Sequence, residues 1–417
     1  FAALFAPKPQ GLTAANDWTK EMPTKGFPEL QKHYALMGAA DKVMLKPLLH
    51  FGHNYNYVSR AAMYSWVNKH FRLGLKEPVV EEDYRRLTRE EMSVWDAQHP
   101  KPEGGPDFER KLLRWLTDDA ARQLADAPKS RETFQKVVGG AVHVLLGRNL
   151  DETGEGTAEP RERTDRGGYW EITGLARNPT HGEELPAVLL RPKQWNRQLV
   201  VWVTPEGKAG LFAATDNGAY QPKPEIQKLL DAGVAVTGVD LLYQGEFLSD
   251  GQPLTRTRRV KNPRESAAYT FGYNPTVFAQ RVQDILSVVK LSRTTEAPPE
   301  VVCLVGLEGA GPWVAAARAL AGAAVDRAVI DTQGFRFARI TDLHDPNFLP
   351  GGAKYFDLPG MIALNAPGRL FLAGEGSAAP RVVTEAYRAA DASDRLRVFQ
   401  GDAAQTRAAA VDWLLGR

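Results

Sequence analysis

From Gly167 onward, the apolar residues of the chain alternate between two patterns. Short continuous apolar runs, such as residues 198–203, predict buried strands, whereas segments in which apolar residues recur every three or four positions, such as 274–292, predict helices. Segments 169–175 and 184–191 predict an antiparallel pair of strands at the start of this region. Buried strands that alternate with helices are typical of an α/β fold, in which a mostly parallel, doubly wound sheet is covered by helices on both faces.

The pattern divides the chain into three parts. Residues 1–75 contain strand and helix patterns, residues 76–166 contain no β-like alternation, and residues 167–417 form the α/β region. We therefore expect 76–166 to be a mostly helical linker whose polar, Gly-rich end, 148–166, is exposed. The apolar strand that follows Phe1 needs strand partners on both sides. The first part is thus expected to be the C-terminal part of a domain whose earlier part lies upstream.

Both ends of the chain carry a similar unit. Residues 3–14 resemble residues 363–374, and each segment is followed by an acidic residue, Asp17 or Glu375. In both places an amphipathic helix, a second short strand and a closing helix come next. A chance similarity between short apolar segments is the alternative, but the matching order of elements favours an internal repeat.

Composition removes several classes of function. The 417 residues include 52 Lys and Arg against 50 Asp and Glu, so there is no basic surplus for binding a nucleic-acid backbone. The single cysteine, Cys303, excludes an internal disulfide and any Cys-based metal cluster, and no cofactor or metal is expected. No apolar run approaches the roughly 18–20 residues that span a bilayer, and no signal-peptide pattern is visible at the start of the chain.

A glycine-rich turn follows the apolar run 300–305. Small residues at Gly306, Gly309 and Gly311, followed by a helix that begins with proline, match the strand–turn–helix layout of a nucleophile elbow. A phosphate-binding loop is the alternative, but neither a Lys-Ser/Thr pair nor a suitably placed acidic residue supports it. The middle residue of the turn is Glu308, where a hydrolase of this layout needs Ser, Cys or Asp. The elbow is therefore expected to be degenerate.

A serine hydrolase with this layout also needs an acid and then a histidine after the elbow. His344 is the last histidine of the chain, and it precedes the strand expected at 370–373. Without a later imidazole, an alcohol nucleophile has no base suited to neutral pH. Residues 167–417 are thus expected to lack the Ser and the His of a triad. A carboxylate pair or metal site stays open as an alternative, in which Glu308 acts with one of three acidic residues: Asp331, Glu206 or Glu375.

The first part of the chain shows the reverse situation. Asp17 follows its first strand and His53 follows its second, which are the positions of a triad acid and base. In these roles His53 takes a proton from an alcohol, and Asp17 orients and stabilises the imidazolium. Asn54, Tyr55 and Asn56 serve either carbohydrate contacts or a turn, and the sequence does not decide between the two. We expect three other aromatic residues to lie in the core or in a lid, and not to form stacking surfaces for sugar rings: Tyr273, Trp313 and Trp202.

These residues carry a resemblance to a known family. Segments 3–19, 52–56 and 87–96, together with 271–275, 306–313 and 349–355, resemble large bacterial α/β-hydrolase proteins of the acetyl xylan esterase-like type. Proteins of that family carry two tandem α/β-hydrolase modules, and their first module holds a Ser, an acid and a His, of which the last two match Asp17 and His53. By this resemblance, the chain corresponds to the tail of module one and all of module two.

The resemblance implies a carboxylic-ester hydrolase, a carbohydrate esterase, whose serine lies outside this chain. It implies an ester-bearing carbohydrate or small ester as substrate, a separate N-terminal polypeptide that completes module one, and a secreted or periplasmic location. Neither nucleic acid nor a membrane is expected as a partner. The alternative is a non-catalytic module, in which residues 167–417 bind carbohydrate or brace a partner.

Overall fold

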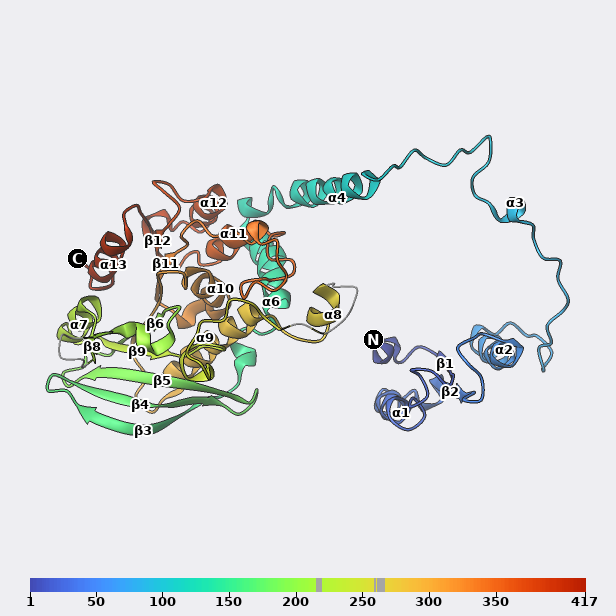
Figure 1. Cartoon of the computed structure of the whole chain (residues 1–417), viewed down its shortest axis with the longest axis horizontal. Helices are drawn as coiled ribbons and strands as arrows, with labels where there is room; N and C mark the ends of the chain where they lie inside the picture. The colour runs from blue at the N-terminus through green and yellow to red at the C-terminus, as the bar shows by residue number, and fades with distance from the viewer. Residues whose placement is uncertain (215–219, 259, 261–266) are drawn as a thin grey trace. The chain divides into compact units, whose positions relative to one another are not determined.

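The structure is a computed structural model that describes residues 1–214, 220–258, 260 and 267–417 (Figure 1). The chain forms two compact units, Phe1–Glu103 (unit 1) and Gly104–Arg417 (unit 2). The boundaries expected at residues 75 and 166 do not coincide with this division.

Unit 1 contains a two-stranded parallel sheet between helices. Strand β1 (Gln10–Ala14) pairs with β2 (Val43–Pro47) in the register Gln10↔Val43 to Ala14↔Pro47. Helix α1 (Gly26–Leu36) connects the strands, and α2 (Tyr57–Phe71) follows β2. The expected order of strand, acidic residue, helix, strand and helix is therefore present.

Close packing fixes these elements on one another. A small core holds Leu30 and Tyr34 of α1 against Ala39 and Val43. On β1, a Cβ atom at Gly11 would lie 2.7 Å from Cδ1 of Trp66 of α2, so only glycine allows this approach. As a result, β1 and β2 end side by side, and the loops that leave them begin together.

Unit 2 is built on a nine-stranded sheet in the order β13-β12-β11-β10-β6-β9-β5-β4-β3. The strands from β13 to β9 run parallel to their neighbours, and β5, β4 and β3 add antiparallel pairs. This confirms the expected mostly parallel sheet and the antiparallel opening pair. The strand bounds are β3 (Thr157–Asp165), β4 (Tyr169–Asn178), β5 (Glu183–Pro192), β6 (Gln198–Val203), β9 (Ala235–Val239), β10 (Val301–Gly306), β11 (Arg327–Asp331), β12 (Arg369–Ala373) and β13 (Leu396–Phe399).

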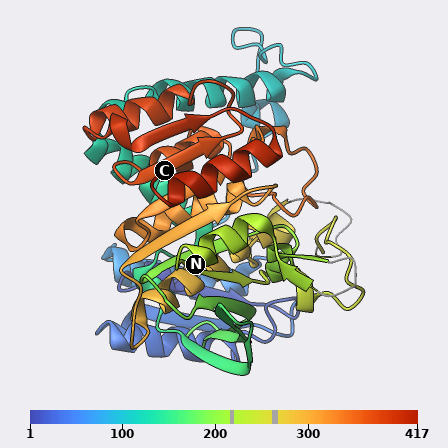
Figure 2. The ribbon, with the colours of Figure 1, turned by 90° about the vertical axis from the view of Figure 1, so that its left-hand side faces the viewer.

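Helices cover both faces of this sheet (Figures 1 and 2). Helices α7 (Pro224–Asp231) and α13 (Ala403–Leu414) contribute to one buried apolar cluster. The other cluster contains residues of α6 (Gly140–Leu146), α9 (Val277–Thr294), α10 (Gly311–Ala321), α11 (Asp357–Ala363) and α12 (Arg381–Ala389).

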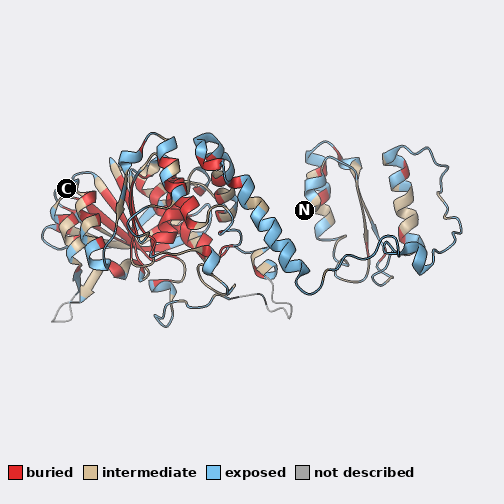
Figure 3. Cartoon of the chain, turned by 90° about the horizontal axis from the view of Figure 1, so that it is seen from above, coloured by how far each residue is buried: buried red, intermediate tan, exposed pale blue. Residues whose placement is uncertain are grey.

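Alternate residues of a strand face the two clusters, since successive side chains of a strand point to opposite faces of a sheet. In β6, Val200 and Trp202 belong to the first cluster, whereas Leu199, Val201 and Val203 belong to the second. The apolar run 199–203 of β6 is thus explained by burial on both faces, and Figure 3 shows the buried residues concentrated in the sheet and its covering helices.

Part of the expected linker belongs to unit 2. Phe134, Val138, Val142 and Leu146 are buried in the second cluster, and their segment contacts α9, α10 and α11, so it is part of unit 2 rather than a linker between two domains. Residues 157–165 form β3, so the expectation of a linker without a strand was wrong here, whereas the expected exposure of this segment is confirmed. The strand is polar because it lies at the edge of the sheet and is exposed along nearly its whole length.

The remaining elements are short or lie at the surface. They are α3 (Arg89–Met92), α4 (Phe108–Leu124), α5 (Arg131–Phe134), α8 (Ala267–Phe271) and the hairpin of β7 (Phe212–Ala214) and β8 (Tyr220–Pro222). Trp202 and Trp313 lie in the core as expected, whereas Tyr273 is 92% exposed. Among the helices of the described residues, none has the length and apolar character needed to cross a membrane.

Candidate active site

The loops that follow β1 and β2 are joined by backbone hydrogen bonds. The amide of Leu48 donates to the carbonyl of Ala14 at 2.8 Å, and the amide of Asn16 donates to the carbonyl of Phe51 at 3.0 Å. Because β1 and β2 are parallel neighbours, both loops leave from the same edge of the sheet. The side chains that follow the two strands are therefore brought within reach of each other.

Asp17 and His53 are in direct contact across these loops. The distance from Nδ1 of His53 to Oδ2 of Asp17 is 2.5 Å. The Asp17 side chain is 19% exposed, and that of His53 is 80% exposed. The structure thus brings together the two residues that the sequence proposes as acid and base, and it leaves the outer edge of the imidazole ring open.

The surroundings of Asp17 keep it ionised. The side chain and the backbone amide of Thr19, followed by His53, donate hydrogen bonds that lower the pKa of Asp17 from 3.8 to about 2. An ionised carboxylate only accepts hydrogen bonds, so Nδ1 of His53 carries the proton in this contact. In the neutral ring, Nε2 then has a free lone pair, which is the form a general base needs.

The loop of His53 is held by the asparagines beside it. The side chain of Asn54 donates to the carbonyl of Gly52 at 2.6 Å and accepts from the amide of Asn56 at 2.9 Å. The side chain of Asn56 accepts from the amide of Ser59 at 3.1 Å, which caps the start of α2. Of the two interpretations of this segment, turn formation describes Asn54 and Asn56.

The turn between β10 and α10 has the sharp geometry of an elbow. Glu308 adopts a left-handed conformation with φ of 55°, and Gly309 follows with φ of 108°. A Cβ atom at Gly306 would lie 2.6 Å from Cγ2 of Val314, and one at Gly311 would lie 1.9 Å from the carbonyl oxygen of Asp331. Gly306 and Gly311 are therefore required because the helix starts directly against neighbouring backbone and side chains.

Glu308 is held by an ion pair at the tip of this turn. Its carboxylate accepts a short hydrogen bond from Nη1 of Arg407, in the first turns of α13. Nε of the same guanidinium lies 3.3 Å from the carboxylate of Glu225. One guanidinium is therefore shared by two carboxylates at the position where a nucleophile would lie.

The positions in unit 2 that match Asp17 and His53 also have structural partners. Glu375 accepts a hydrogen bond from the Thr332 hydroxyl at 2.6 Å and forms a bidentate pair with Arg336. Asp402 caps α13 in a reciprocal arrangement with Gln405. Instead of an acid–base pair, this end of the sheet has an ion pair and a helix cap.

The alternative role of Glu308 pairs it with another carboxylate, and Asp331 is one candidate. Burial raises the pKa of Asp331, and the charge of Glu308 raises it further. Glu375, by contrast, is bound to Arg336. Within the described residues, no group of three or more His, Cys, Asp or Glu side chains is arranged to hold a metal ion.

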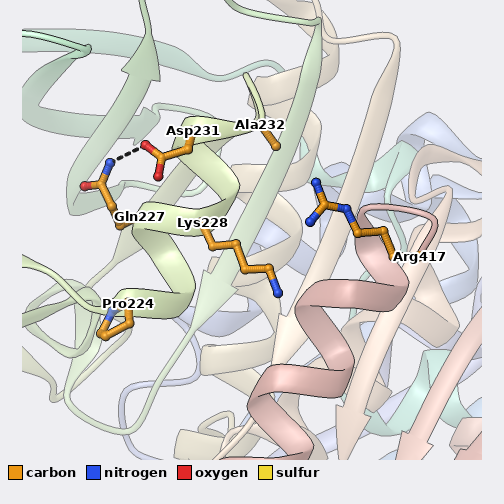
Figure 4. A pocket seen from close by; sticks show the side chains of 6 residues that line it. All are labelled: Pro224, Gln227, Lys228, Asp231, Ala232 and Arg417. Carbon is orange, nitrogen blue, oxygen red and sulfur yellow. Dashed lines mark hydrogen bonds between the residues drawn. The ribbon is translucent and has the colours of Figure 1, made fainter.

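Two hollows of unit 2 lie apart from these residues. Figure 4 shows the first, between α7 and the C-terminal end of the chain, where Gln227 donates to Asp231 at 2.7 Å. Its Lys228 is paired with Asp412 at 2.6 Å.

The second hollow, of about 730 Å³, lies along the antiparallel strands and α9 and has a mainly apolar lining. Neither hollow has a histidine or cysteine among the described residues that line it, so neither offers an imidazole or a thiol for catalysis.

Three residues of these sites were not identified from the sequence. Arg336 and Arg407 become partners of Glu375 and Glu308 only through the fold, because 39 and 99 positions separate the members of each pair. Thr19 had a local signal, since an Asp followed two positions later by a hydrogen-bonding residue is typical of a side-chain-closed turn.

Comparison with known proteins gives matches among solved structures only. No protein-family model matches the sequence, and no curated protein matches it. The chain is similar to a putative acetyl xylan esterase from Bacteroides fragilis, with 15% identity over 65% of this chain and 76% of that chain and a TM-score of 0.45.

Two further structures show a comparable level of similarity. For acetyl xylan esterase 1 from Thermoanaerobacterium, identity is 12% over 62% of this chain and 85% of that chain, with a TM-score of 0.37. For a promiscuous esterase from a marine bacterial metagenome, identity is 13% over 63% of this chain and 84% of that chain, with a TM-score of 0.43. At such identities, no residue role transfers from these structures to this chain.

Proposed function

We propose that Asp17 and His53 are the acid and the general base of a Ser-His-Asp carboxylic-ester hydrolase whose serine lies outside this sequence. The observation that carries the proposal is the contact between Nδ1 of His53 and Oδ2 of Asp17. The pKa of Asp17, lowered to about 2, keeps the acid ionised, which a triad requires but a structural ion pair also shows. The support for a base comes from the His53 side chain, which is 80% exposed and open to a second polypeptide or a substrate.

The reaction follows from the protonation states of the pair. Nε2 of His53 takes the proton of the serine hydroxyl while the serine oxygen bonds to the ester carbonyl carbon. Asp17 stabilises the imidazolium, which then gives its proton to the leaving alcohol as the ester bond breaks. A water molecule, deprotonated by the same Nε2, hydrolyses the acyl-enzyme and restores the serine. Donors for the oxyanion belong to the segment that supplies the serine.

The substrate class follows the resemblance described under sequence analysis. In this proposal, the substrate is an ester-bearing carbohydrate, and a separate N-terminal polypeptide or segment completes the α/β-hydrolase module to which unit 1 belongs. Unit 2 is assigned a non-catalytic role, as a carbohydrate-binding or structural module with the α/β-hydrolase topology. The ion pairs of Glu308 and Glu375 favour this role, because each of these carboxylates is already bound to an arginine.

A fluorophosphonate probe tests the assignment in the protein purified from its native source. We expect the probe to label a serine outside these 417 residues, and we expect His53→Ala to abolish the labelling. The same substitution is expected to lower turnover of an acetylated xylan or a p-nitrophenyl ester about 10³-fold, because the general base is removed.

His50→Ala is the matched control, since His50 is an exposed histidine in the same loop that stacks on Phe51. It is expected to leave both readouts unchanged. Labelling of a serine within unit 2, or ester turnover that does not depend on His53, would overturn the proposed function.

A further inference from the structure

Thr19 makes three hydrogen bonds that link the backbone of unit 1 to the carboxylate of Asp17. The amide of Ala15 donates to Oγ1 of Thr19 at 2.9 Å. Oγ1 of Thr19 donates to Oδ1 of Asp17 at 2.7 Å, and the amide of Thr19 donates to the same oxygen at 2.9 Å. A hydroxyl has one proton and two lone pairs, so it accepts from Ala15 and donates to Asp17 at the same time.

The direction of the hydroxyl proton is fixed by charge and distance. Among the described residues, the other acceptor near Oγ1 is the carbonyl oxygen of Ala15, which is neutral and farther away, at 3.5 Å. A hydrogen bond to an ionised carboxylate is shorter and stronger than one to a neutral acceptor. The proton therefore points to Asp17.

These bonds divide the two oxygens of Asp17 between different partners. Oδ1 is occupied by the two donors of Thr19, and Oδ2 is left for Nδ1 of His53. A rotation of the carboxylate would break two hydrogen bonds to Thr19. The plane of the carboxylate is therefore set by Thr19, and the plane in turn sets where Oδ2 meets the imidazole.

We propose that Thr19 is a positioning residue, whose hydroxyl aims Oδ2 of Asp17 at His53 and so selects the imidazole tautomer with the proton on Nδ1. The catalytic meaning of this role rests on the proposed function. The role itself, which concerns the orientation and the tautomer, does not.

A turn alone would not require this hydroxyl. The bond from the Thr19 amide to Asp17 closes a common side-chain turn, and any residue except proline at position 19 could donate it. The hydroxyl adds the link from Ala15 to Asp17. In unit 2, the carboxylate at the matching position, Glu375, is held by Thr332 and Arg336, and it meets no imidazole.

The causes of the lowered pKa of Asp17 agree with the hydrogen bonds made to its carboxylate. The hydroxyl of Thr19 is the largest cause of the lowered pKa of Asp17, ahead of the Thr19 amide and His53. The charge that His53 carries when it is protonated also lowers this pKa, but it is the smallest of the causes. Loss of the hydroxyl is thus expected to move the pKa of Asp17 from about 2 toward its ordinary value of 3.8.

The test measures the tautomer of His53 in the whole chain labelled with ¹⁵N-histidine. Long-range ¹⁵N–¹H spectra at about pH 8 report which ring nitrogen carries the proton in the neutral ring. His53→Gln identifies the resonances of His53 among those of the 8 histidines. We expect the Nδ1–H form in the unmodified protein and in Thr19→Ser, and a mixture of tautomers in Thr19→Val and Thr19→Ala.

The control is Thr24→Val, because the exposed hydroxyl of Thr24 donates only to the carbonyl of Glu21 in the same loop region. It is expected to preserve the Nδ1–H form. An unchanged tautomer in both Thr19→Val and Thr19→Ala would overturn the proposal, as would loss of the preference in Thr19→Ser. Two variants that differ in side-chain size are used so that misfolding of one does not decide the result.

A second readout separates this proposal from the proposed function. In the protein complete with its serine, Thr19→Val is expected to lower kcat for a p-nitrophenyl ester about 10-fold or more with little change in KM, because the base is misaligned but substrate contacts remain. If the Thr19 variants shift the tautomer but ester turnover does not depend on His53, the esterase assignment is rejected and the positioning role of Thr19 is kept. His53-dependent turnover with no tautomer shift would reject the positioning role alone.

Discussion

Arg407 forms an ion pair with Glu308 at the tip of the elbow of unit 2. The pair links the start of α13 to the turn between β10 and α10, two segments that are 99 positions apart in sequence. In a working hydrolase of this layout, the same place holds a nucleophile that needs a base and room for a substrate. Here the carboxylate has a cationic partner, and that partner is shared with Glu225.

Arg407→Met should destabilise unit 2 by about 1–2 kcal/mol, because it leaves the partly buried carboxylates of Glu308 and Glu225 without a cation. Urea unfolding followed by tryptophan fluorescence measures this loss as a lower midpoint. Arg110→Met is the control, since Arg110 forms an exposed pair with Asp107 at the start of α4 and should change stability by less than about 0.5 kcal/mol. Equal effects of the two substitutions would show that the elbow pair has no special stabilising role.

Glu308→Gln should leave ester turnover of the complete protein unchanged, because the proposed base lies in unit 1. Gln keeps the size of the side chain and a carbonyl oxygen that accepts from Arg407, so the elbow should stay folded. The measurement is hydrolysis of a p-nitrophenyl ester beside the His53→Ala variant. A large loss of kcat in Glu308→Gln would instead support carboxylate chemistry by Glu308 together with Asp331.

Gly311→Ala should destabilise unit 2 by about 2–4 kcal/mol, since the added Cβ atom would lie 1.9 Å from the carbonyl oxygen of Asp331. The backbone of β11 or of the elbow must move to accept it. Gly140→Ala is the control, because a Cβ atom at Gly140, at the start of α6, meets nothing within 4 Å. Thermal unfolding should show a lower Tm for the first variant and an equal or higher Tm for the second.

Asp284→Asn should make the pH dependence of stability less steep between about pH 4 and 7. Burial raises the pKa of Asp284 from 3.8 to about 7, so in this range the folded state holds a proton that the unfolded state has lost. Stability therefore falls as pH rises through this window, and the cost is fully present above pH 7. Asn has no carboxyl group to ionise and removes this cost.

The free energy of unfolding in urea, measured at several pH values, tests this expectation. The difference in stability between the Asn variant and the unmodified protein should change between about pH 4 and about pH 8. At the higher pH, it should favour the Asn variant by on the order of 2 kcal/mol more than at the lower pH. Asp391→Asn, at an exposed aspartate, controls for the substitution itself. Parallel pH curves for the unmodified protein and Asp284→Asn would contradict the raised pKa.

The sheet of unit 2 could be predicted from sequence because most of its strands are buried on both faces. From Leu199 to Val203, β6 has no polar position, and the apolar periodicity of α9 lies between the buried strands β9 and β10. The contact between Asp17 and His53 could also be anticipated, since residues that follow neighbouring parallel strands meet at one edge of a sheet.

Other features depend on contacts that no local pattern shows. Strand β3 was missed because its residues are exposed and mostly polar, so that it lacks the alternation of a half-buried strand. The burial of Phe134 and Val138 in unit 2 depends on distant helices. The arginine partners of Glu308 and Glu375 likewise follow from the fold, because any of the 52 Lys and Arg residues could have been a candidate.

The polar and charged residues of β3, which made the strand hard to predict, also affect the behaviour of the protein at high concentration. An unpaired outer strand invites backbone pairing with another molecule, which is a common start of aggregation. Any incoming strand would meet the charges of Glu159, Arg161, Glu162 and Arg163, and it would find no amide donor at Pro160, where the register of the strand also shifts. The edge formed by β3 is thus protected against backbone pairing with another molecule, by its charges and by the missing amide donor.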